Sequence, residues 1–229
     1  MSAHPLDRPV WNMLNGPQAS LAVARGAAVR LDPGYGPFAA ARDDSAEAQA
    51  ALTALLTDPA DRIWIVETRE WPAPPGTRVE KVAELVQLTA PEPASMRPGD
   101  ETVELLGDDD VPAMAELALA TRPGPWGALT QCYGAYYGIR HEGRLAAMAG
   151  ERMRPAPGFA EVSGVCTWPE HRGQGHAARL IRRIMAGFTA RGDTPFLHSY
   201  AANDGAIRLY QSLGFEIRSN LIATVLARA

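Results

Sequence analysis

Cysteine is scarce in this chain of 229 residues, and lysine is scarcer still. The two cysteines, Cys132 and Cys166, lie far apart, and neither belongs to a CxxC pair. This scarcity argues against a disulfide framework and against a zinc site. We therefore expect a cytoplasmic protein that binds no metal. Lys81 is the single lysine among 22 basic residues, so nearly every positive charge is an arginine guanidinium.

Long apolar runs and basic clusters are also lacking. No segment approaches the roughly 20 apolar residues that a helix needs to cross a bilayer, and residues 1–11 contain no apolar core of signal-peptide length. Residues 1–98 carry 9 basic and 12 acidic side chains, and the remainder carries 13 and 14. Neither part is basic enough to predict a nucleic-acid partner, and we expect no membrane partner.

The composition is that of a packed globular protein, with 46% hydrophobic and 21% charged residues. A polar, proline-rich segment at 91–100 (PEPASMRPGD) is the best candidate for a linker. We therefore predict an N-terminal α+β lobe over residues 1–98 and a second domain over residues 99–229. Sequence patterns in the first lobe predict a hairpin at 20–31 around Gly26, a helix at 45–57 capped by Ser45, and a strand at 61–67.

The second part alternates predicted strands and helices. The expected elements are a strand at 103–106, a helix at 110–120 capped by Asp110, a hairpin that turns at 141–143, and strands at 144–153 and 159–167. Gly150, inside a strand, predicts a bulge or a close backbone approach. In a regular strand, alternation places Glu161, Ser163, Val165 and Thr167 on one face.

The most informative stretch is TWPEHRGQGHAARLI, residues 167–181. Pro169 ends the preceding strand, and the apolar residues that follow recur at the spacing of a helix on a sheet. They are Ala177, Leu180, Ile181, Ile184, Met185 and Phe188. The turn between strand and helix contains two glycines, which let backbone pass close to a ligand. Free N–H groups at the start of a helix form an anion site suited to phosphate.

Two common phosphate-binding motifs do not fit this turn. A Walker loop requires a lysine, which the turn lacks, and only the first half of the dinucleotide pattern GxGxxG is present. The pattern R-x-x-G-x-A at 172–177 instead resembles the diphosphate-binding signature of the GNAT superfamily of acyl-CoA-dependent N-acetyltransferases. Residues 196–217 are similar to the superfamily's following strand, helix and strand, with Asn203 and an A-x-x-L-Y segment that ends at Tyr210. The resemblance covers about residues 101–229.

The resemblance implies an α/β (α+β) GNAT-like fold, with a mixed, mostly antiparallel central sheet, splayed strands and flanking helices. Gly214 is placed to stop the helix that contains Tyr210. The N-terminal lobe is considered as a degenerate copy of the same fold, because it too shows strands and a helix. We expect this lobe to shape the acceptor pocket or to support the sheet, since it lacks the phosphate turn.

The resemblance also implies acetyl-CoA as co-substrate and no metal. The pantetheine arm would lie between splayed strands, with residues 144–153 and 159–167 on one side and 194–200 on the other. The arm would pair with the strand backbone, and the amides of the glycine-rich turn would hold the diphosphate. The cofactor-binding residues implied in this way are Val165, Cys166, Thr167, Arg172, Gly173, Gln174, Gly175, His176, Ala177 and Asn203.

Transfer in this superfamily proceeds by direct attack of an amine on the thioester. Tyr210 is the expected proton donor to the departing thiolate, because a phenol with a pKa near 10 faces a thiol with a pKa near 8.5. Glu151 and Glu161 are the carboxylates on the strands expected to flank the site, and they are the candidate bases. The residues alone do not choose between these carboxylates and a water relay.

The function predicted is transfer of an acetyl group from acetyl-CoA to an amine of a small molecule or peptide, by a monomer or homodimer. Two alternatives stay open at this point. One is a regulatory or sensor module that binds acyl-CoA without turnover. The other is a transferase with a different acyl donor.

Overall fold

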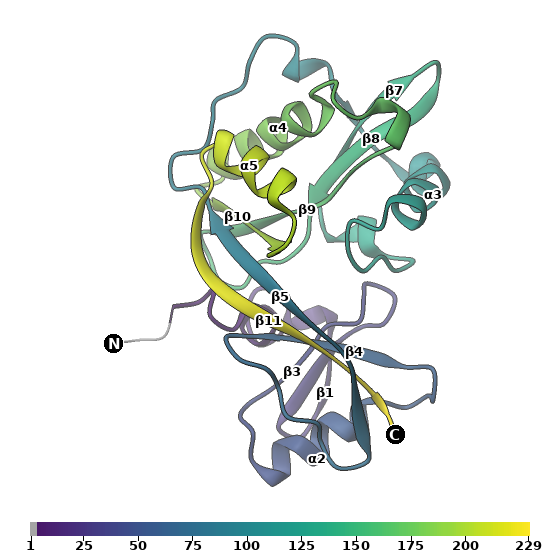
Figure 1. Ribbon diagram of the computed structural model, residues 1–229, viewed down its shortest axis with the longest axis vertical. Coiled ribbons are helices and arrows are strands. Elements are labelled where there is room, and N and C mark those ends of the chain that lie inside the picture. Colours follow the sequence, from purple (N-terminus) through teal and green to yellow (C-terminus); the bar gives the residue numbers. More distant parts are fainter. Residues whose placement is uncertain (1–3) are drawn as a thin grey trace.

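The structure is a computed structural model that describes residues 4–229 (Figure 1). Its centre is an eight-stranded sheet with the strand order β4-β11-β5-β10-β9-β8-β7-β6. The strands are β4 (Arg62–Glu67), β5 (Thr77–Thr89), β6 (Glu104–Leu105), β7 (Tyr136–His141), β8 (Arg144–Glu151), β9 (Phe159–Thr167), β10 (Thr194–Tyr200) and β11 (Glu216–Arg228). Neighbouring strands are antiparallel except β9 and β10, which are parallel. The expected mixed, mostly antiparallel sheet is confirmed.

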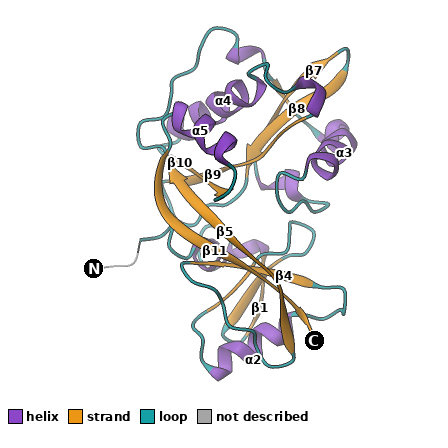
Figure 2. Cartoon of the chain, in the orientation of Figure 1, coloured by secondary structure: helices purple, strands orange, loops and turns teal. Residues whose placement is uncertain are grey.

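The parallel strands β9 and β10 separate soon after they begin. Their pairing runs from Thr194 opposite Phe159 to Phe196 opposite Glu161. Beyond this point β10 continues beside β5, while β9 continues beside β8. The two strands therefore splay apart beyond Phe196 and Glu161, as β9 continues with β8 into the upper half of the view and β10 follows β5 (Figures 1 and 2).

A β-bulge interrupts β9 at Gly164. Met148 lies opposite Cys166, but Gly150 lies opposite Ser163, so β9 holds one extra residue between these pairs. Gly164 has a φ of +62°, and an added Cβ would lie 2.9 Å from the Tyr136 ring. The bulge shifts the alternation of side chains by one residue. The prediction that Glu161, Ser163, Val165 and Thr167 share one face was therefore wrong. The bulge predicted near Gly150 is present, with the extra residue on the partner strand.

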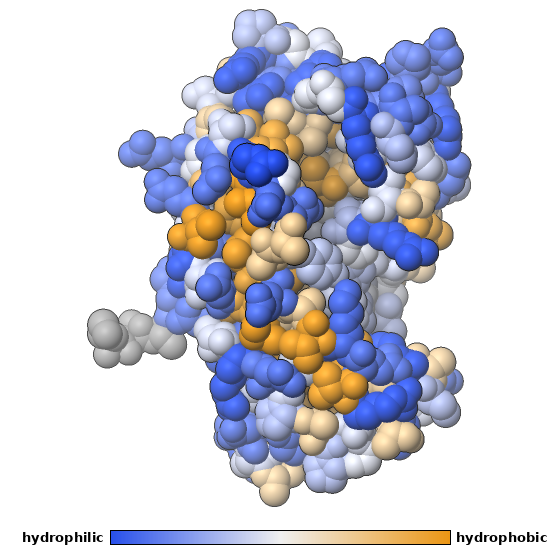
Figure 3. Space-filling model, viewed as in Figure 1, coloured by the Kyte–Doolittle hydropathy of each residue, from blue (hydrophilic) through white to orange (hydrophobic). Residues whose placement is uncertain are grey.

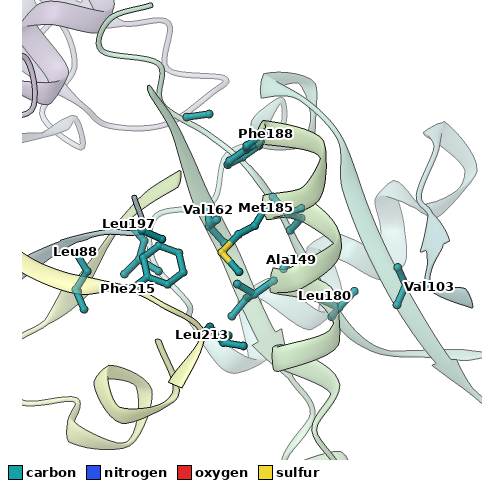
Figure 4. Close-up of a cluster of buried hydrophobic side chains, with 14 of the residues drawn as sticks. Leu88, Val103, Ala149, Val162, Leu180, Met185, Phe188, Leu197, Leu213 and Phe215 are labelled. Atoms are coloured by element: carbon teal, nitrogen blue, oxygen red, sulfur yellow. The ribbon is translucent and has the colours of Figure 1, made fainter. Parts of the chain in front are cut away.

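Helices cover both faces of the splayed half of the sheet. α4 (His176–Ala190) packs on β8 and β9 from one side, and α3 (Val111–Thr121) packs on the same strands with a separate cluster of buried residues. Figure 4 shows Met185 of α4 directed toward Val162 of the sheet, with Phe188 one turn further along the helix and Leu180 on the side of Val103. The buried stripe predicted from the sequence is confirmed. Asp110 does not cap α3 with its side chain, because its carboxylate accepts the backbone N–H of Gly107 at 2.8 Å.

The last helix, α5 (Asp204–Ser212), connects β10 to β11. Gly214 follows its C-terminus with a φ of +91°, in the left-handed region that favours glycine. A Cβ at this position would lie 2.5 Å from the carbonyl oxygen of Glu92. The prediction that Gly214 stops the helix is confirmed, and the close approach explains why no larger residue fits.

The N-terminal residues form a second, smaller layer. Its elements are α1 (Pro9–Leu14), β1 (Ala22–Arg25), β2 (Ala28–Leu31), β3 (Ala39–Ala41) and α2 (Ala46–Leu55). β1, β2 and β3 form an antiparallel sheet, and the Ser45 hydroxyl caps α2 by accepting the N–H of Ala48. The predicted hairpin, helix and strand in this region are confirmed. Short 3₁₀ helices lie at Ala19–Leu21, Asp100–Thr102, Asp108–Asp110, Thr130–Tyr133 and Pro169–His171.

The main sheet does not divide at the expected boundary between residues 98 and 99. β4 and β5 come from the N-terminal part, and β5 lies between β10 and β11 of the C-terminal part. β1, β2 and β3 contain only antiparallel pairs, so they do not repeat the topology of the splayed sheet. The N-terminal residues described here therefore complete the central sheet rather than form a second copy of it.

Candidate active site

A cavity of about 690 Å³ opens where β9 and β10 separate. Its lining combines residues from both parts of the chain. β9 and β10 contribute Val165–Thr167 and His198–Tyr200, the loop after α3 contributes Thr121–Pro125, α5 and its start contribute Asn203, Leu209 and Tyr210, and the N-terminal part contributes Phe38, Trp64, Val66 and Leu85. The expectation that N-terminal residues reach the pocket agrees with this lining.

The glycine-rich turn forms one end of the cavity and continues into a second hollow of about 250 Å³. Gly173 and Gly175 both have a φ of +76°, and Gly175 begins α4 without a side-chain cap. Within residues 4–229, no protein carbonyl accepts the backbone N–H groups of residues 173–177. Unpaired amides at the positive end of a 15-residue helix form a site for a phosphate group.

The residues implied for cofactor binding fall into three groups. Val165, Cys166, Thr167, Arg172, Gly173, Ala177 and Asn203 line the larger cavity. Gly175 and His176 line only the smaller hollow, and Gln174 lines neither. Gln174 thus contributes through its place in the turn rather than through its side chain.

His176 occupies the first position of α4. Both ring nitrogens are buried without a hydrogen-bond partner among the described residues. Burial, together with the nearby charge of Arg179, lowers the pKa of His176. The lowered pKa favours a neutral ring beside the turn, where His176 lines the smaller hollow.

Asn203 caps the N-terminus of α5. Its side-chain oxygen accepts the backbone N–H of Ala206 at 3.2 Å, which satisfies one free amide of the helix. Asn203 and Tyr210 both line the cavity, as their seven-residue spacing predicts. Only the amide nitrogen of Asn203 is left to face a ligand.

Tyr210 places a phenol against the middle of the cavity lining. Its ring packs edge-on against Phe215, with 6.0 Å between centroids. No protein group in the described chain forms a hydrogen bond with its hydroxyl. Burial raises the pKa of Tyr210 to about 12. The hydroxyl is therefore protonated at neutral pH and available as a donor.

Cys166 is not a nucleophile. Burial raises the pKa of its thiol to about 12, because a thiolate is costly away from water. Its side chain belongs to the apolar cluster between α3 and the sheet. Cys166 therefore contributes to the cavity as a small apolar wall.

Glu151 does not line the cavity. Its carboxylate is buried and pairs with Arg154 and with Arg191 of the α4 C-terminus, the latter at 3.1 Å. It lies at the end of β8, where it joins that strand to α4. Glu151, expected as a candidate base, is held by two arginines outside the cavity lining, and this geometry does not favour that role.

Glu161 is fully buried behind Arg152 and His198. Both of its oxygens accept from Arg152 at 2.8 Å, and one lies 2.7 Å from Nδ1 of His198. Burial opposes ionisation, but the charge and hydrogen bonds of Arg152 outweigh it and lower the pKa of Glu161 to about 2. A carboxylate with so low a pKa is a poor proton acceptor, so Glu161 is not retained as a base either.

Sequence reasoning missed Arg152 and His198 as cavity residues. Arg152 follows β8 directly, and its ion pair with Glu161 crosses the hairpin formed by β8 and β9. The Nε2 atom of His198 lies at hydrogen-bond distance, 2.9 Å, from the Nε2 atom of Gln87 on β5. The only local signal was the position of a histidine inside a predicted strand, which does not specify a partner.

Residues 4–229 show neither a metal-binding cluster nor a membrane-spanning helix. No group of three or more His, Cys, Asp and Glu side chains is arranged to hold a metal ion. No helix in that range is both long and apolar enough to span a membrane.

A splayed β9–β10 pair, unpaired amides at the start of α4 and Tyr210 thus lie around the cavity and its adjoining hollow. Comparison with known proteins identifies the family. Residues 136–223 match the family model described as FR47-like protein. A curated relative, the N-alpha-acetyltransferase RimI of Mycobacterium tuberculosis, is 33% identical over 108 residues, which are 44% of this chain and 67% of that protein.

Solved structures extend the likeness to the whole chain. A structure assigned to the GNAT acetyltransferases from Novosphingobium aromaticivorans is 58% identical, with a TM-score of 0.92 over 99% of this chain and 100% of that chain. A GCN5-related N-acetyltransferase from Kribbella flavida is 22% identical, with a TM-score of 0.59 over 90% of this chain and 88% of that one, and it shares the fold. This chain belongs to the GNAT superfamily and is an N-acetyltransferase.

Proposed function

We propose that this N-acetyltransferase uses acetyl-CoA as donor and binds it along the 690 Å³ cavity. The diphosphate would lie on the amides of residues 173–177, and the pantetheine arm would run beside β9 toward Tyr210. The observation that carries the proposal is that Gly173 and Ala177 of the unpaired turn line the same cavity as Tyr210, while Gly175 and His176 line the adjoining hollow. A donor that spans the two points places its thioester near the tyrosine.

The chemistry assigned to Tyr210 is proton donation to the leaving thiolate. The amine nitrogen attacks the thioester carbonyl, the N–C bond forms, the C–S bond breaks, and the sulfur takes the tyrosine proton. The nitrogen releases one proton to solvent, and Tyr210 regains one from solvent. With a phenol pKa of about 12 and a thiol pKa near 8.5, transfer of the tyrosine proton to the fully formed thiolate costs about 5 kcal/mol. The hydroxyl therefore acts mainly by donating a hydrogen bond to the sulfur as negative charge develops on it, and the transfer is completed by the return of a proton from solvent to Tyr210.

The acceptor amine must reach the carbonyl without its proton. No aspartate or glutamate lines the cavity among the described residues. Deprotonation at pH 7 costs about 4.6 kcal/mol for a lysine-like amine and about 1 kcal/mol for an α-amine. We propose that the amine loses its proton to solvent before it attacks, and that an amine of low pKa is favoured.

The proposal also covers the N-terminal residues, the cellular compartment and the oligomeric state. We propose that N-terminal residues such as Phe38 and Trp64 form the acceptor end of the cavity, which they line. We also propose a cytoplasmic monomer or homodimer, because both cysteines are free thiols. Fractionation of cells and size-exclusion chromatography test these two points.

Thermal unfolding with acetyl-CoA tests the proposal. At a hundredfold excess over Kd, a ligand that binds only the folded state stabilises it by about 2.7 kcal/mol. CoA release on addition of amines then separates an enzyme from a sensor that binds without turnover. The absence of stabilisation by any acyl-CoA would contradict the proposal.

A further inference from the structure

The acceptor end of the cavity presents cationic groups without a carboxylate. Arg122 and Arg152 line it, and no acidic side chain does so among the residues described. Glu161 is close by, but it is fully buried and both of its oxygens are taken by Arg152. An acceptor with a second ammonium group would find no partner here, and a desolvated charge without a partner is costly.

Arg152 has hydrogen-bond capacity left over. Its Nε and Nη2 atoms donate to Glu161, whereas Nη1 has no partner in the described chain. Nη1 faces the loop after α3, since a Cβ added at Gly124 would lie 3.8 Å from it. The guanidinium carbon lies 5.0 Å from the centroid of the Phe38 ring, which also lines the cavity. Two free N–H donors are thus held rigidly beside an aromatic wall.

A second cation lies at the edge of the same end. The ammonium group of Lys81 lies 5.1 Å from the Tyr200 ring centroid and 5.9 Å from that of Trp64. Both rings line the cavity. Lys81 and Trp64 are brought together because each pairs with Val225 of β11. The only lysine of the chain is therefore placed over the cavity's aromatic residues without an acidic partner in residues 4–229.

Most of the remaining lining at this end is apolar and consists of Phe38, Trp64, Val66, Leu85 and Met153. His198 also lines the cavity, and its Nδ1 atom lies 2.7 Å from Glu161, the partner of Arg152. Figure 3 shows apolar side chains gathered in a band across the middle of the molecule, bordered by hydrophilic residues. A ligand that fits this end carries an apolar group, and its polar group is one that accepts hydrogen bonds from cations.

We infer that the acceptor is a free α-amino acid with an apolar side chain, whose carboxylate binds Nη1 of Arg152 within the field of Lys81. This inference rests on the proposed function and narrows its acceptor. The amine forms an N–C bond to the acetyl carbonyl and releases a proton to solvent, while the thiolate leaves with the Tyr210 proton. The products are an N-acetyl amino acid and CoA.

Three matched acceptors test the inference through the rate of CoA release. They are phenylalanine, phenylalaninamide and phenethylamine, which keep the ring and the amine but differ at the carboxylate. Phenylalaninamide also stands for the N-terminus of a peptide. Because the carboxylate also changes the pKa of the neighbouring amine, kcat/KM is compared per deprotonated amine. On that scale we expect phenylalanine to exceed each of the others by about tenfold or more, the effect of one charge-assisted hydrogen bond.

Variants test which residues cause the preference for phenylalanine. Lys81→Gln changes an exposed side chain and is expected to reduce the advantage of phenylalanine several-fold, whereas Arg25→Gln, on exposed β1, leaves it unchanged. The double variant Arg152→Gln and Glu161→Gln removes both buried charges together, so no unpaired charge is left behind. It is expected to abolish the preference while acetyl-CoA still raises the unfolding temperature.

The outcomes separate the two proposals. If acetyl-CoA stabilises the protein but phenylalaninamide or phenethylamine reacts as fast as phenylalanine, the inference about the acceptor is overturned and the enzyme assignment stands. The inference about the acceptor is also overturned if the enzyme releases no CoA with leucine, tryptophan or phenylalanine. If acetyl-CoA does not bind, the proposed function itself fails.

Discussion

Asp100 forms a two-pronged ion pair with Arg182, although 82 positions separate them in the sequence. The Nε and Nη2 atoms of Arg182 donate to the two carboxylate oxygens at 2.6 and 2.8 Å. Asp100 is 1% exposed and Arg182 is 6% exposed. The pair fastens the end of the 91–100 segment to the middle of α4, so this predicted linker is anchored at its last residue.

Replacement of Asp100 by asparagine is expected to destabilise the fold by about 3 kcal/mol, because it leaves a buried guanidinium without a counter-charge. Chemical denaturation of this variant and of Asp109→Asn, at an exposed acid nearby, measures the difference. Equal stability of the two variants would contradict the role of the ion pair.

The same pair predicts a dependence on pH. Hydrogen bonds from Arg182 outweigh burial and lower the pKa of Asp100 in the folded state. A lowered folded-state pKa means that the stabilisation is complete above the unfolded-state pKa near 3.9 and is lost as the pH falls through the folded-state value. We expect the free energy of unfolding to decline below about pH 4 less steeply in Asp100→Asn than in the native chain. Parallel declines in denaturation series at several pH values would exclude this contribution.

Tyr210→Phe is expected to lower kcat by about a hundredfold or more, as loss of a general acid does. Stabilisation by acetyl-CoA is expected to persist, because the ring still fills its place against Phe215. Tyr137→Phe, at a half-buried tyrosine packed under Arg183, is the matched control. A native rate in Tyr210→Phe would remove the tyrosine from the mechanism.

Gly175→Ala and Gly192→Ala form a matched pair around α4. The two glycines have φ angles of +76° and +79°, and an added Cβ meets nothing within 4 Å at either position. Each variant is expected to lose about 1 kcal/mol of stability through left-handed strain. Only Gly175→Ala is expected to bind acetyl-CoA about tenfold more weakly, the equivalent of one lost hydrogen bond. Isothermal titration measures the affinities, and an equal effect at Gly192 would argue against the cradle.

The pH dependence of kcat/KM is expected to follow the acceptor rather than the protein. The pKa of Tyr210, raised to about 12 by burial, keeps the acid protonated throughout the accessible range. The rate should therefore rise with pH until the amine is deprotonated and then level off, near pH 8 for a peptide-like α-amine and above pH 10 for a lysine-like amine. A midpoint that stays fixed across acceptors would reveal a titrating protein group.

Deletion of residues 1–95 is expected to give insoluble protein. It removes β4 and β5, so β11 loses both of its neighbours in the sheet and β10 loses one. Co-expression of residues 1–95 with residues 96–229 should restore some soluble material. A well-folded, fully active fragment 100–229 would show that the sheet tolerates the loss.

The sequence alone determined the features that depend on neighbouring residues. The glycine-rich turn, the buried stripe of α4, the Ser45 cap and the helix stop at Gly214 are set by local backbone geometry and periodicity. They could be predicted because each requires particular residue types within a few positions. The position of Tyr210 on the cavity also followed from its spacing to Asn203.

Tertiary structure alone decided which charged groups could act. Both glutamates were candidate bases on the sequence alone. In the structure Glu161 pairs with Arg152 and His198. Glu151 pairs with Arg154 and Arg191. Insertion of β5 between β10 and β11 likewise joins segments more than 100 positions apart. Such partners are chosen by packing across the whole chain, and an ionisable group takes its properties from those partners rather than from its neighbours in sequence.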